Sequence, residues 1–133
     1  VAFQTQLLGV KPGDKILEIG TGSGYQACVL EELGAEVYSI ERQQKLFVKT
    51  KTLLTQMGYK ARLILGDGYL GLPELAPFDA ILITAAAPKV PETLFEQLKN
   101  GGVLVSPVGG GGVQTMMRFT KSKTGNLSKQ TFG

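Results

Sequence analysis

Apolar and polar residues recur along this chain with two different periods, and each period predicts a different element. Short runs rich in Val, Ile and Leu are typical of buried strands, whereas apolar residues spaced three or four apart are typical of one face of a helix. The short runs predict strands at 15–19, 36–40, 61–65, 79–84 and 103–107. The spaced pattern predicts helices at 1–9, 24–33, 43–57 and 91–99.

Two connecting segments depart from this alternation. The segment 69–78 holds two prolines, so we expect at most one helical turn there. After the fifth strand, the four glycines at 109–112 predict a mobile loop, and 115–121 with 127 onward predict a hairpin that turns at 123–126. In the helix 43–57, the residues expected to be buried are Leu46, Phe47, Leu53, Leu54 and Met57.

Strands and helices that alternate in this way predict an α/β fold. We expect one domain over all 133 residues, built on a doubly wound, Rossmann-like parallel sheet of order 3-2-1-4-5 with a C-terminal antiparallel hairpin. Right-handed crossovers bring the carboxyl ends of the parallel strands to one edge of the sheet, where such folds bind ligands.

A glycine-rich turn follows the first predicted strand. Gly20, Gly22 and Gly24 allow the backbone to approach a ligand closely because glycine has no Cβ. A dinucleotide fingerprint would place its third glycine where this chain has Tyr25. Glu18 would repel a pyrophosphate and suits an ammonium group instead. The turn therefore fits a cationic, amino-acid-bearing nucleoside such as S-adenosylmethionine better than it fits NAD.

Two further carboxylates follow the next strands. Glu41 ends the second strand about 20 residues beyond Gly20, where a nucleotide-binding unit places an acid on the ribose hydroxyls. Asp67 follows the third strand and could accept a hydrogen bond from an adenine amine. Any one of these acids could be a solvated strand end, but three of them in register with the glycine turn predict a nucleoside site.

The composition narrows the chemistry. There is no histidine, which excludes Ser-His-Asp and Cys-His catalysis and histidine metal sites, and we expect no metal. The single cysteine, Cys28, excludes an intramolecular disulfide. It lies in the apolar part of a predicted helix, so we interpret it as a structural thiol rather than a nucleophile.

The net charge of +3 is unevenly spread, because no acidic residue follows Glu96. The lysines and the arginine that follow Glu96 could form a nucleic-acid face, but they are not interleaved with stacking aromatic residues. Lysines that protect exposed edge strands explain them more simply. No apolar segment approaches the ~20 residues of a membrane span. We expect neither a nucleic acid nor a membrane as partner, and the features are typical of a cytoplasmic protein.

The chain resembles the protein-L-isoaspartate O-methyltransferase family, which are class I S-adenosylmethionine-dependent enzymes that methylate isoaspartyl residues in damaged proteins. The resemblance rests on Leu17-Glu-Ile-Gly-Thr-Gly-Ser-Gly-Tyr25, Gly66-Asp-Gly68, Ala76-Pro-Phe-Asp-Ala-Ile81, Thr84-Ala-Ala-Ala-Pro88 and the run from Gln97 to Gly109. The glycine turn alone indicates only a class I methyltransferase. The Ala-Ala-Ala-Pro run and the Pro-Val-Gly loop are the family-specific parts.

The resemblance implies a protein-repair carboxyl methyltransferase that uses S-adenosylmethionine, releases S-adenosylhomocysteine and acts on isoaspartyl peptides and proteins. It implies that the cofactor is held by Glu18, Gly20, Thr21, Gly22, Ser23, Gly24, Glu41, Asp67 and Gly68. It implies that the peptide groove is bordered by Ala86, Ala87, Pro88, Pro107, Val108 and Gly109.

The family also carries an N-terminal segment with an active-site Ser or Thr in an Ile-Ser-x-Pro-like motif, which this sequence does not contain. No catalytic residue is therefore assigned. We expect the chain to be a piece of a longer protein that lacks an N-terminal segment and its C-terminal end.

Three other functions stay open on the sequence. Another class I methyltransferase could act on a small molecule or RNA, although such enzymes often carry an acidic-aromatic motif where this chain has Thr84-Ala-Ala-Ala-Pro88. The chain could also be a cofactor-binding fragment without activity. An NAD-dependent dehydrogenase is the third, and the spacing of the glycines disfavours it.

Overall fold

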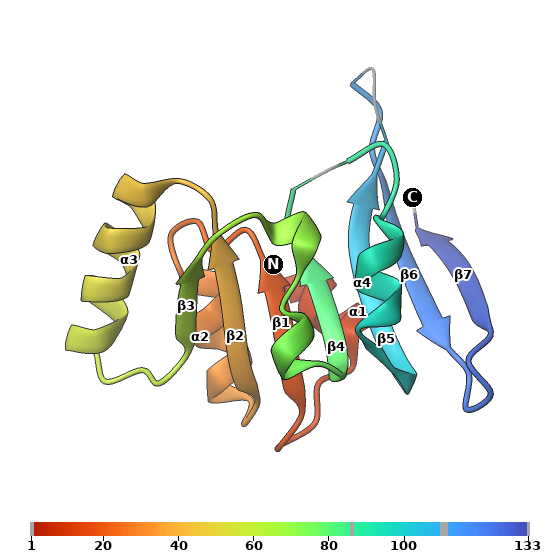
Figure 1. Cartoon of the computed structure of the whole chain (residues 1–133), viewed down its shortest axis with the longest axis horizontal. Coiled ribbons are helices and arrows are strands. Elements are labelled where there is room, and N and C mark those ends of the chain that lie inside the picture. The colour runs from red at the N-terminus through yellow and green to blue at the C-terminus, as the bar shows by residue number, and fades with distance from the viewer. Residues whose placement is uncertain (1, 86, 110–111, 133) are drawn as a thin grey trace.

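A seven-stranded sheet forms the centre of the computed structural model, which describes residues 2–85, 87–109 and 112–132 (Figure 1). The order is β3-β2-β1-β4-β5-β6-β7, with the first five strands parallel and the last two antiparallel to their neighbours. This confirms the predicted parallel order and the C-terminal hairpin. The strands are β1 (Lys15–Ile19), β2 (Glu36–Glu41), β3 (Arg62–Leu65), β4 (Phe78–Ile83), β5 (Leu98–Val108), β6 (Thr115–Lys121) and β7 (Leu127–Phe132).

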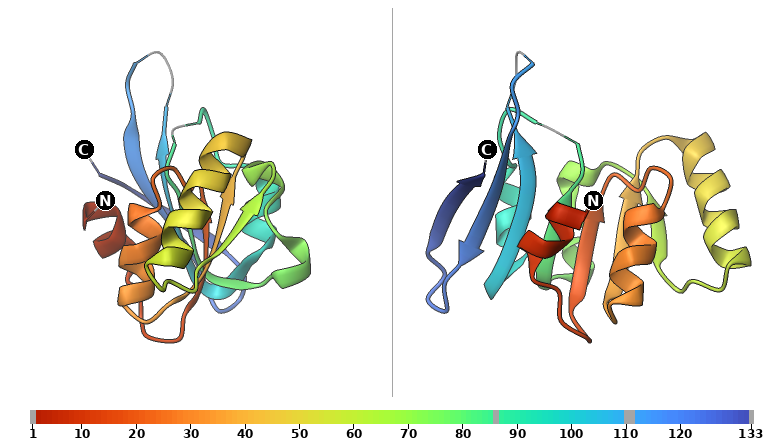
Figure 2. Two further views of the ribbon diagram at one scale, coloured as in Figure 1. Left: turned by 90° about the vertical axis from the view of Figure 1, so that its left-hand side faces the viewer. Right: turned by 180° about the vertical axis from the view of Figure 1, so that it is seen from behind.

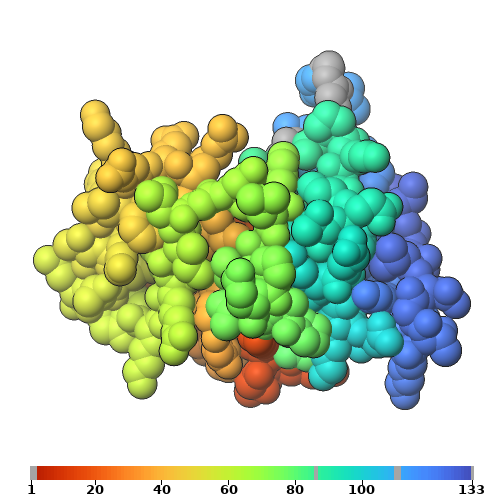
Figure 3. All heavy atoms as spheres, viewed as in Figure 1, coloured from red at the N-terminus to blue at the C-terminus, as the bar shows by residue number. Residues whose placement is uncertain are grey.

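Helices cover both faces of the sheet. Figure 2 shows α1 and α2 in front of the strands when the molecule is seen from behind, and side chains of α3 join the same core layer. In Figure 3 the connection between β3 and β4, in green, lies across the opposite face between α3 and α4. The helices are α1 (Ala2–Leu8), α2 (Tyr25–Glu32), α3 (Gln44–Gln56), α4 (Glu92–Glu96) and the 3₁₀ turns η1 (Gly68–Leu70) and η2 (Pro73–Leu75).

The core consists of two apolar layers, one on each face of the central strands. Ile16 and Leu82 point into the layer under α1 and α2, whereas Leu17 and Ile81 point into the layer under α4. All four side chains are fully buried. Strands buried on both faces read as continuous apolar runs, which is why β1 and β4 could be recognised in the sequence.

The fourth helix is shorter than predicted and the fifth strand is longer. The prediction of a helix over 91–99 was wrong at its end, because Leu98 already pairs with Phe78 of β4 and both side chains are buried. A Cβ on Gly102 would lie 2.8 Å from the carbonyl oxygen of Asp79. Glycine lets the backbone at 102 pass this close to β4, where an irregularity separates the Phe78–Leu98 pair from the Ala80–Val103 pair.

Two other predictions need correction. The segment 69–78 forms two single 3₁₀ turns rather than at most one helical turn. In α3, Leu54 is buried, but Leu53 and the C-cap residue Met57 are 46% and 59% exposed, so the prediction that they are buried was wrong. Because α3 packs over one face of the two outermost strands, β2 and β3, only a narrow stripe of the helix is covered. No helix within the described ranges is long and apolar enough to cross a membrane.

Candidate functional site

A cleft of about 310 Å³ opens at the carboxyl ends of β1, β2 and β4. This is the edge of the sheet where the sequence placed the glycine turn and the two strand-end acids. Its lining consists of Ile19, Gly20, Gly22, Ile40, Glu41, Arg42, Gln43, Leu46, Asp67, Gly68, Tyr69, Ile83, Thr84 and Ala85.

The glycine turn is fixed to β4 by Thr84. The Thr84 hydroxyl shares its single hydrogen between the carbonyl oxygens of Ile19 and Gly20, each 2.9 Å from Oγ1. Gly20 has φ +98°, and a Cβ there would lie 2.3 Å from the Thr84 Oγ1 atom. The turn therefore needs glycine at this position for two reasons, the backbone conformation and the space that Thr84 occupies.

Glu41 connects the end of β2 to the glycine turn. Its Oε1 accepts a hydrogen bond from the backbone N–H of Gly22 at 3.0 Å, and its Oε2 accepts one from the N–H of Gln43 at 2.9 Å. The side chain is 5% exposed and borders the cleft. Each carboxylate oxygen has a second acceptor site. Glu41 can therefore hold the turn and still accept hydroxyl groups of a ligand.

The Asp67–Gly68 turn forms another wall of the cleft. The Asp67 side chain is exposed, and its Oδ1 accepts from the backbone N–H of Tyr69 at 3.0 Å, which caps η1. A Cβ on Gly68 would lie 2.2 Å from the Cγ2 atom of Ile19. The absence of a side chain at Gly68 thus lets η1 approach β1 and places Asp67 at the mouth of the cleft.

Glu18 does not border the cleft but lies buried behind it. Ser39 donates its hydroxyl hydrogen to Glu18 Oε1 at 2.5 Å, so Thr21, 2.6 Å from Ser39 Oγ, must be the donor in the second bond. Glu18 Oε2 has no hydrogen-bond partner among the described residues. Burial raises the pKa of the Glu18 carboxyl to about 7, the bond from Ser39 lowers it in part, and the charge of Glu41 raises it.

Glu18 should make the stability of the protein depend on pH. Its pKa is raised from 4.5 to about 7, so the folded state binds the proton more tightly than the unfolded chain does. The resulting stability is fully present below pH 4.5 and is lost as the pH rises through 7. We expect the wild type to lose roughly 2.5 kcal/mol more than Glu18→Gln between about pH 5 and pH 8.

Urea denaturation at both pH values measures this difference. Gln keeps the acceptor for Ser39 but cannot ionise, so its stability should change less across the window. Glu92→Gln, on an exposed acid at the start of α4, is the matched control and should follow the wild type. If Glu18→Gln and the wild type lose the same stability, the buried carboxyl does not titrate in this window.

The nine predicted cofactor residues divide into two groups. Gly20, Gly22, Glu41, Asp67 and Gly68 line the cleft. The other four lie outside its lining. Glu18 and Thr21 are buried with Ser39, the Ser23 side chain is exposed, and Gly24 packs against Thr50 and Leu54.

Sequence reasoning missed Thr84 and Tyr69 as cleft residues. Thr84 directly follows β4, beside the end of β1, and that position at the carboxyl end of a central strand is the signal that could have identified it. Tyr69 is 45% exposed and follows the Gly66-Asp-Gly68 turn, but nothing in its sequence context distinguishes it from an ordinary surface tyrosine.

The loops expected to border a peptide groove lie side by side. Ala87 and Val108 form an isolated parallel bridge, and the backbone N–H of Gly109 donates to the carbonyl oxygen of Ala87 at 3.0 Å. Pro107 is buried in β5 and Pro88 is exposed. Ala86, which was also predicted to border the groove, lies outside the described residues.

The donors and acceptors of the cleft fit an adenosine-type ligand. Glu41 offers free acceptor capacity for hydroxyl groups, and Ile19, Ile40 and Leu46 supply an apolar wall. At Gly22 no protein atom lies within 4 Å of a Cβ position, which leaves room for a ligand against the turn. Behind the turn lies Glu18, whose unpartnered oxygen favours a cationic neighbour. Within the ranges that the structure describes, no three acidic or thiol side chains gather as a metal site.

Cys28 lies away from this cleft. It is partly buried and packs against the core layer under α1 and α2. Its pKa is raised, chiefly by desolvation, which keeps the thiol protonated. Both observations favour a structural role over a nucleophilic one.

Comparison with known proteins identifies the family. The family model for protein-L-isoaspartate(D-aspartate) O-methyltransferase matches residues 1–132. The protein-L-isoaspartate O-methyltransferase of Christiangramia forsetii is 55% identical over 134 aligned positions, which cover 100% of this chain and 62% of that protein. The chain thus spans about three fifths of the length of such relatives.

Solved structures agree with the sequence relatives. A protein-L-isoaspartate O-methyltransferase is 32% identical with a TM-score of 0.86, and the match covers 99% of this chain and 44% of that one. A Plasmodium falciparum chain described as an enzyme of the same kind, in complex with S-adenosyl-L-homocysteine, is 25% identical with a TM-score of 0.76, over 96% of this chain and 66% of its own. This chain therefore belongs to the protein-L-isoaspartate(D-aspartate) O-methyltransferase family.

Proposed function

We propose that this chain carries the cofactor site and part of the peptide groove of an enzyme that methylates the free carboxylate of L-isoaspartyl residues in damaged proteins. Family membership supports this, and so does the geometry of Glu41. A buried carboxylate whose two oxygens already hold the glycine turn and the start of α3 is a preformed acceptor for two neighbouring hydroxyls. That single observation carries the assignment of the cleft to S-adenosylmethionine.

Each part of the cleft would hold a different part of the cofactor. Glu41 would accept the ribose hydroxyls, Asp67 and Gly68 would hold the adenine end, and the glycine turn would hold the methionine end. Glu18, with Thr21 linked to it through Ser39, would support that turn from behind and favour a positive charge there. S-adenosylmethionine supplies, when bound, an electrophilic methyl group on a sulfonium, and the product would be S-adenosylhomocysteine.

The substrate end of the site needs little chemistry. A carboxylate with a reference pKa near ~4 is already ionised at neutral pH, so the acceptor needs no general base. Alignment of the bound reactants can lower the barrier by roughly 7–11 kcal/mol. We propose that Ala86, Ala87 and Pro88, together with Pro107, Val108 and Gly109, shape the groove that aligns the peptide. None of these six residues is ionisable, which suits a reaction that depends on positioning.

The kind of bond formed distinguishes this proposal from an amine or RNA methyltransferase. We expect labelled methyl to pass from S-adenosylmethionine to an isoaspartyl peptide as a methyl ester. Mild base hydrolyses an ester and releases the label as volatile methanol, whereas a methylated amine or base keeps it. Label that resists base would contradict carboxyl methylation.

We place the reaction in the cytoplasm, because the single cysteine and the predicted chemistry suit that compartment.

A further inference from the structure

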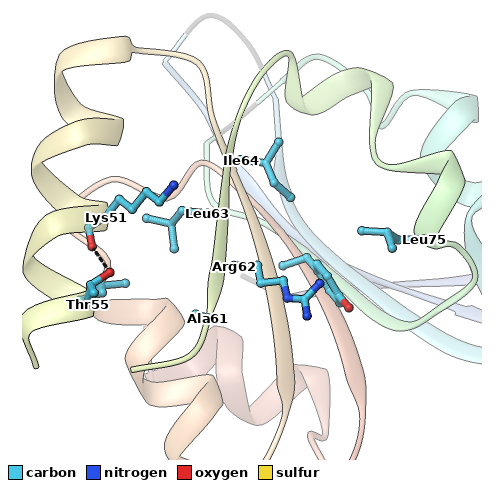
Figure 4. A pocket seen from close by; sticks show the side chains of 9 residues that line it. Lys51, Thr55, Ala61, Arg62, Leu63, Ile64 and Leu75 are labelled. Atoms are coloured by element: carbon cyan, nitrogen blue, oxygen red, sulfur yellow. Dashed lines mark hydrogen bonds between the residues drawn. The ribbon is translucent and has the colours of Figure 1, made fainter. Parts of the chain in front are cut away.

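A second hollow, the edge groove, lies at the β3 end of the sheet and shares no residue with the cofactor cleft. Its volume is about 480 Å³. Figure 4 shows α3 on one side of β3 and Leu75 on the other. The groove is lined by Tyr38, Lys51, Leu54, Thr55, Ala61, Arg62, Leu63, Ile64 and Leu75.

The floor of this groove is the free edge of β3. Among the described strands β3 pairs only with β2, and the backbone N–H of Gly66 bonds the carbonyl oxygen of Glu41. In a parallel ladder, successive residues turn their N–H and C=O groups alternately toward opposite neighbours. The backbone N–H and C=O groups of Arg62 and Ile64 therefore point toward β2. Those of Leu63 and Leu65 point away from the sheet. An extended chain could pair with them.

Apolar residues of the groove are available to contact the side chains on both faces of an added strand. Leu54 and Leu63 belong to the apolar layer on the α3 side, whereas Tyr38, Ile64 and Leu75 belong to the layer on the opposite side. Because successive side chains of a strand point to opposite faces, a chain paired with β3 would place alternate residues against each set. Domains that bind peptides by strand addition use the same division between backbone pairing and side-chain pockets.

The charge of the elements that form the groove favours an acidic partner. The stretch 42–66, which contains α3 and β3, has no Asp or Glu. The acids that contact the lining, Glu31 and Glu36, already accept hydrogen bonds from the Ala61 N–H and the Tyr38 hydroxyl. In Figure 4, Lys51 extends from α3 toward β3, and Arg62 lies on the other side of the strand. Both side chains are exposed, so one cation is present on each side of the edge. The basic residues of this stretch are Arg42, Lys45, Lys49, Lys51, Lys60 and Arg62.

We propose that the edge groove is a docking site for an extended acidic peptide segment, which adds to the sheet as a strand beside β3. A second copy of this chain is a poor occupant, since pairing β3 with β3 would bring the two basic stretches together. A nucleic acid is also a poor occupant. The one aromatic side chain in the lining, Tyr38, is 4% exposed and offers no face for stacking. The inference is independent of methyl transfer.

Fluorescence anisotropy with the whole chain tests the proposal. The probe is a fluorescein-labelled peptide of about eight residues in which pairs of glutamates alternate with pairs of valines, so that each face of the added strand carries both residue types, at low ionic strength. We expect it to bind, and the peptide with lysine in place of glutamate not to bind. A peptide with the same side chains but alternate backbone nitrogens methylated should bind at least ~10-fold more weakly, because it cannot pair with β3.

Two double variants locate the site. Lys51→Glu with Arg62→Glu should weaken binding at least ~10-fold. Lys123→Glu with Lys129→Glu makes the same change in net charge at exposed positions near the other edge and should leave binding unchanged. Equal binding of the methylated peptide, equal loss in the two double variants, or tighter binding of an oligouridylate of equal charge would each overturn the proposal.

Discussion

Gly22→Val is expected to abolish binding of S-adenosylmethionine by a chain that still folds. Gly22 has φ +55° and lines the cleft, and no protein atom lies within 4 Å of a Cβ built there. The valine side chain would therefore enter the space of the ligand rather than collide with the protein. The left-handed backbone conformation costs a valine about 1–2 kcal/mol, which a folded domain can tolerate.

Gly9→Val is the matched control for this variant. Gly9 has φ +63°, also has no atom within 4 Å of a Cβ, and lies at the end of α1, away from the cleft. Both variants should lose similar stability in urea denaturation, but only Gly22→Val should lose S-adenosylhomocysteine binding in calorimetry. A folded Gly22→Val chain that binds with wild-type affinity would show that the ligand does not approach the glycine turn.

Glu41→Ala should weaken cofactor binding by about 100-fold, or roughly 3 kcal/mol. The variant removes the proposed acceptor for the ribose hydroxyls. It also removes the bonds to the backbone N–H groups of Gly22 and Gln43, so the turn loses its support. Glu41→Gln keeps one carbonyl oxygen and should show a smaller loss. Calorimetric titration with S-adenosylhomocysteine measures both.

Glu36→Ala provides the control for Glu41→Ala. Glu36 begins the same strand that Glu41 ends, so it lies at the amino end of β2, away from the cleft, and is exposed. Its removal should leave cofactor affinity unchanged. If Glu41→Ala binds as tightly as Glu36→Ala, Glu41 is not part of the site and the assignment of the cleft is wrong.

The parallel order of the sheet could be predicted because each central strand corresponds to a short apolar run in the sequence. β1 and β4 are buried on both faces and are flanked by glycine or proline, and right-handed crossovers then leave few arrangements. The positions of Glu41 and Asp67 at the cleft follow from the same rule, because a residue at the carboxyl end of a parallel strand lies at the ligand-binding edge.

The remaining features depend on contacts between distant segments. Leu98 leaves the expected helix because it meets Phe78, twenty residues earlier in the chain, and no local signal records that pairing. Leu53 has helical spacing but faces solvent, because α3 packs over the two outermost strands, β2 and β3. Glu18 is buried against Ser39 of the neighbouring strand, and no local pattern indicates that contact. The sequence therefore predicted a Glu18 carboxyl that contacts the ligand, whereas in the structure this carboxyl lies behind the glycine turn.

The central claim is that this chain takes part in methylating isoaspartyl carboxylates, and one comparison tests it most directly. A preparation shown to bind S-adenosylhomocysteine is given labelled S-adenosylmethionine with an isoaspartyl peptide or with its normal aspartyl twin. We predict base-labile label on the isoaspartyl peptide and none on the twin. Equal label on both peptides, or label only on the aspartyl twin, would contradict the account.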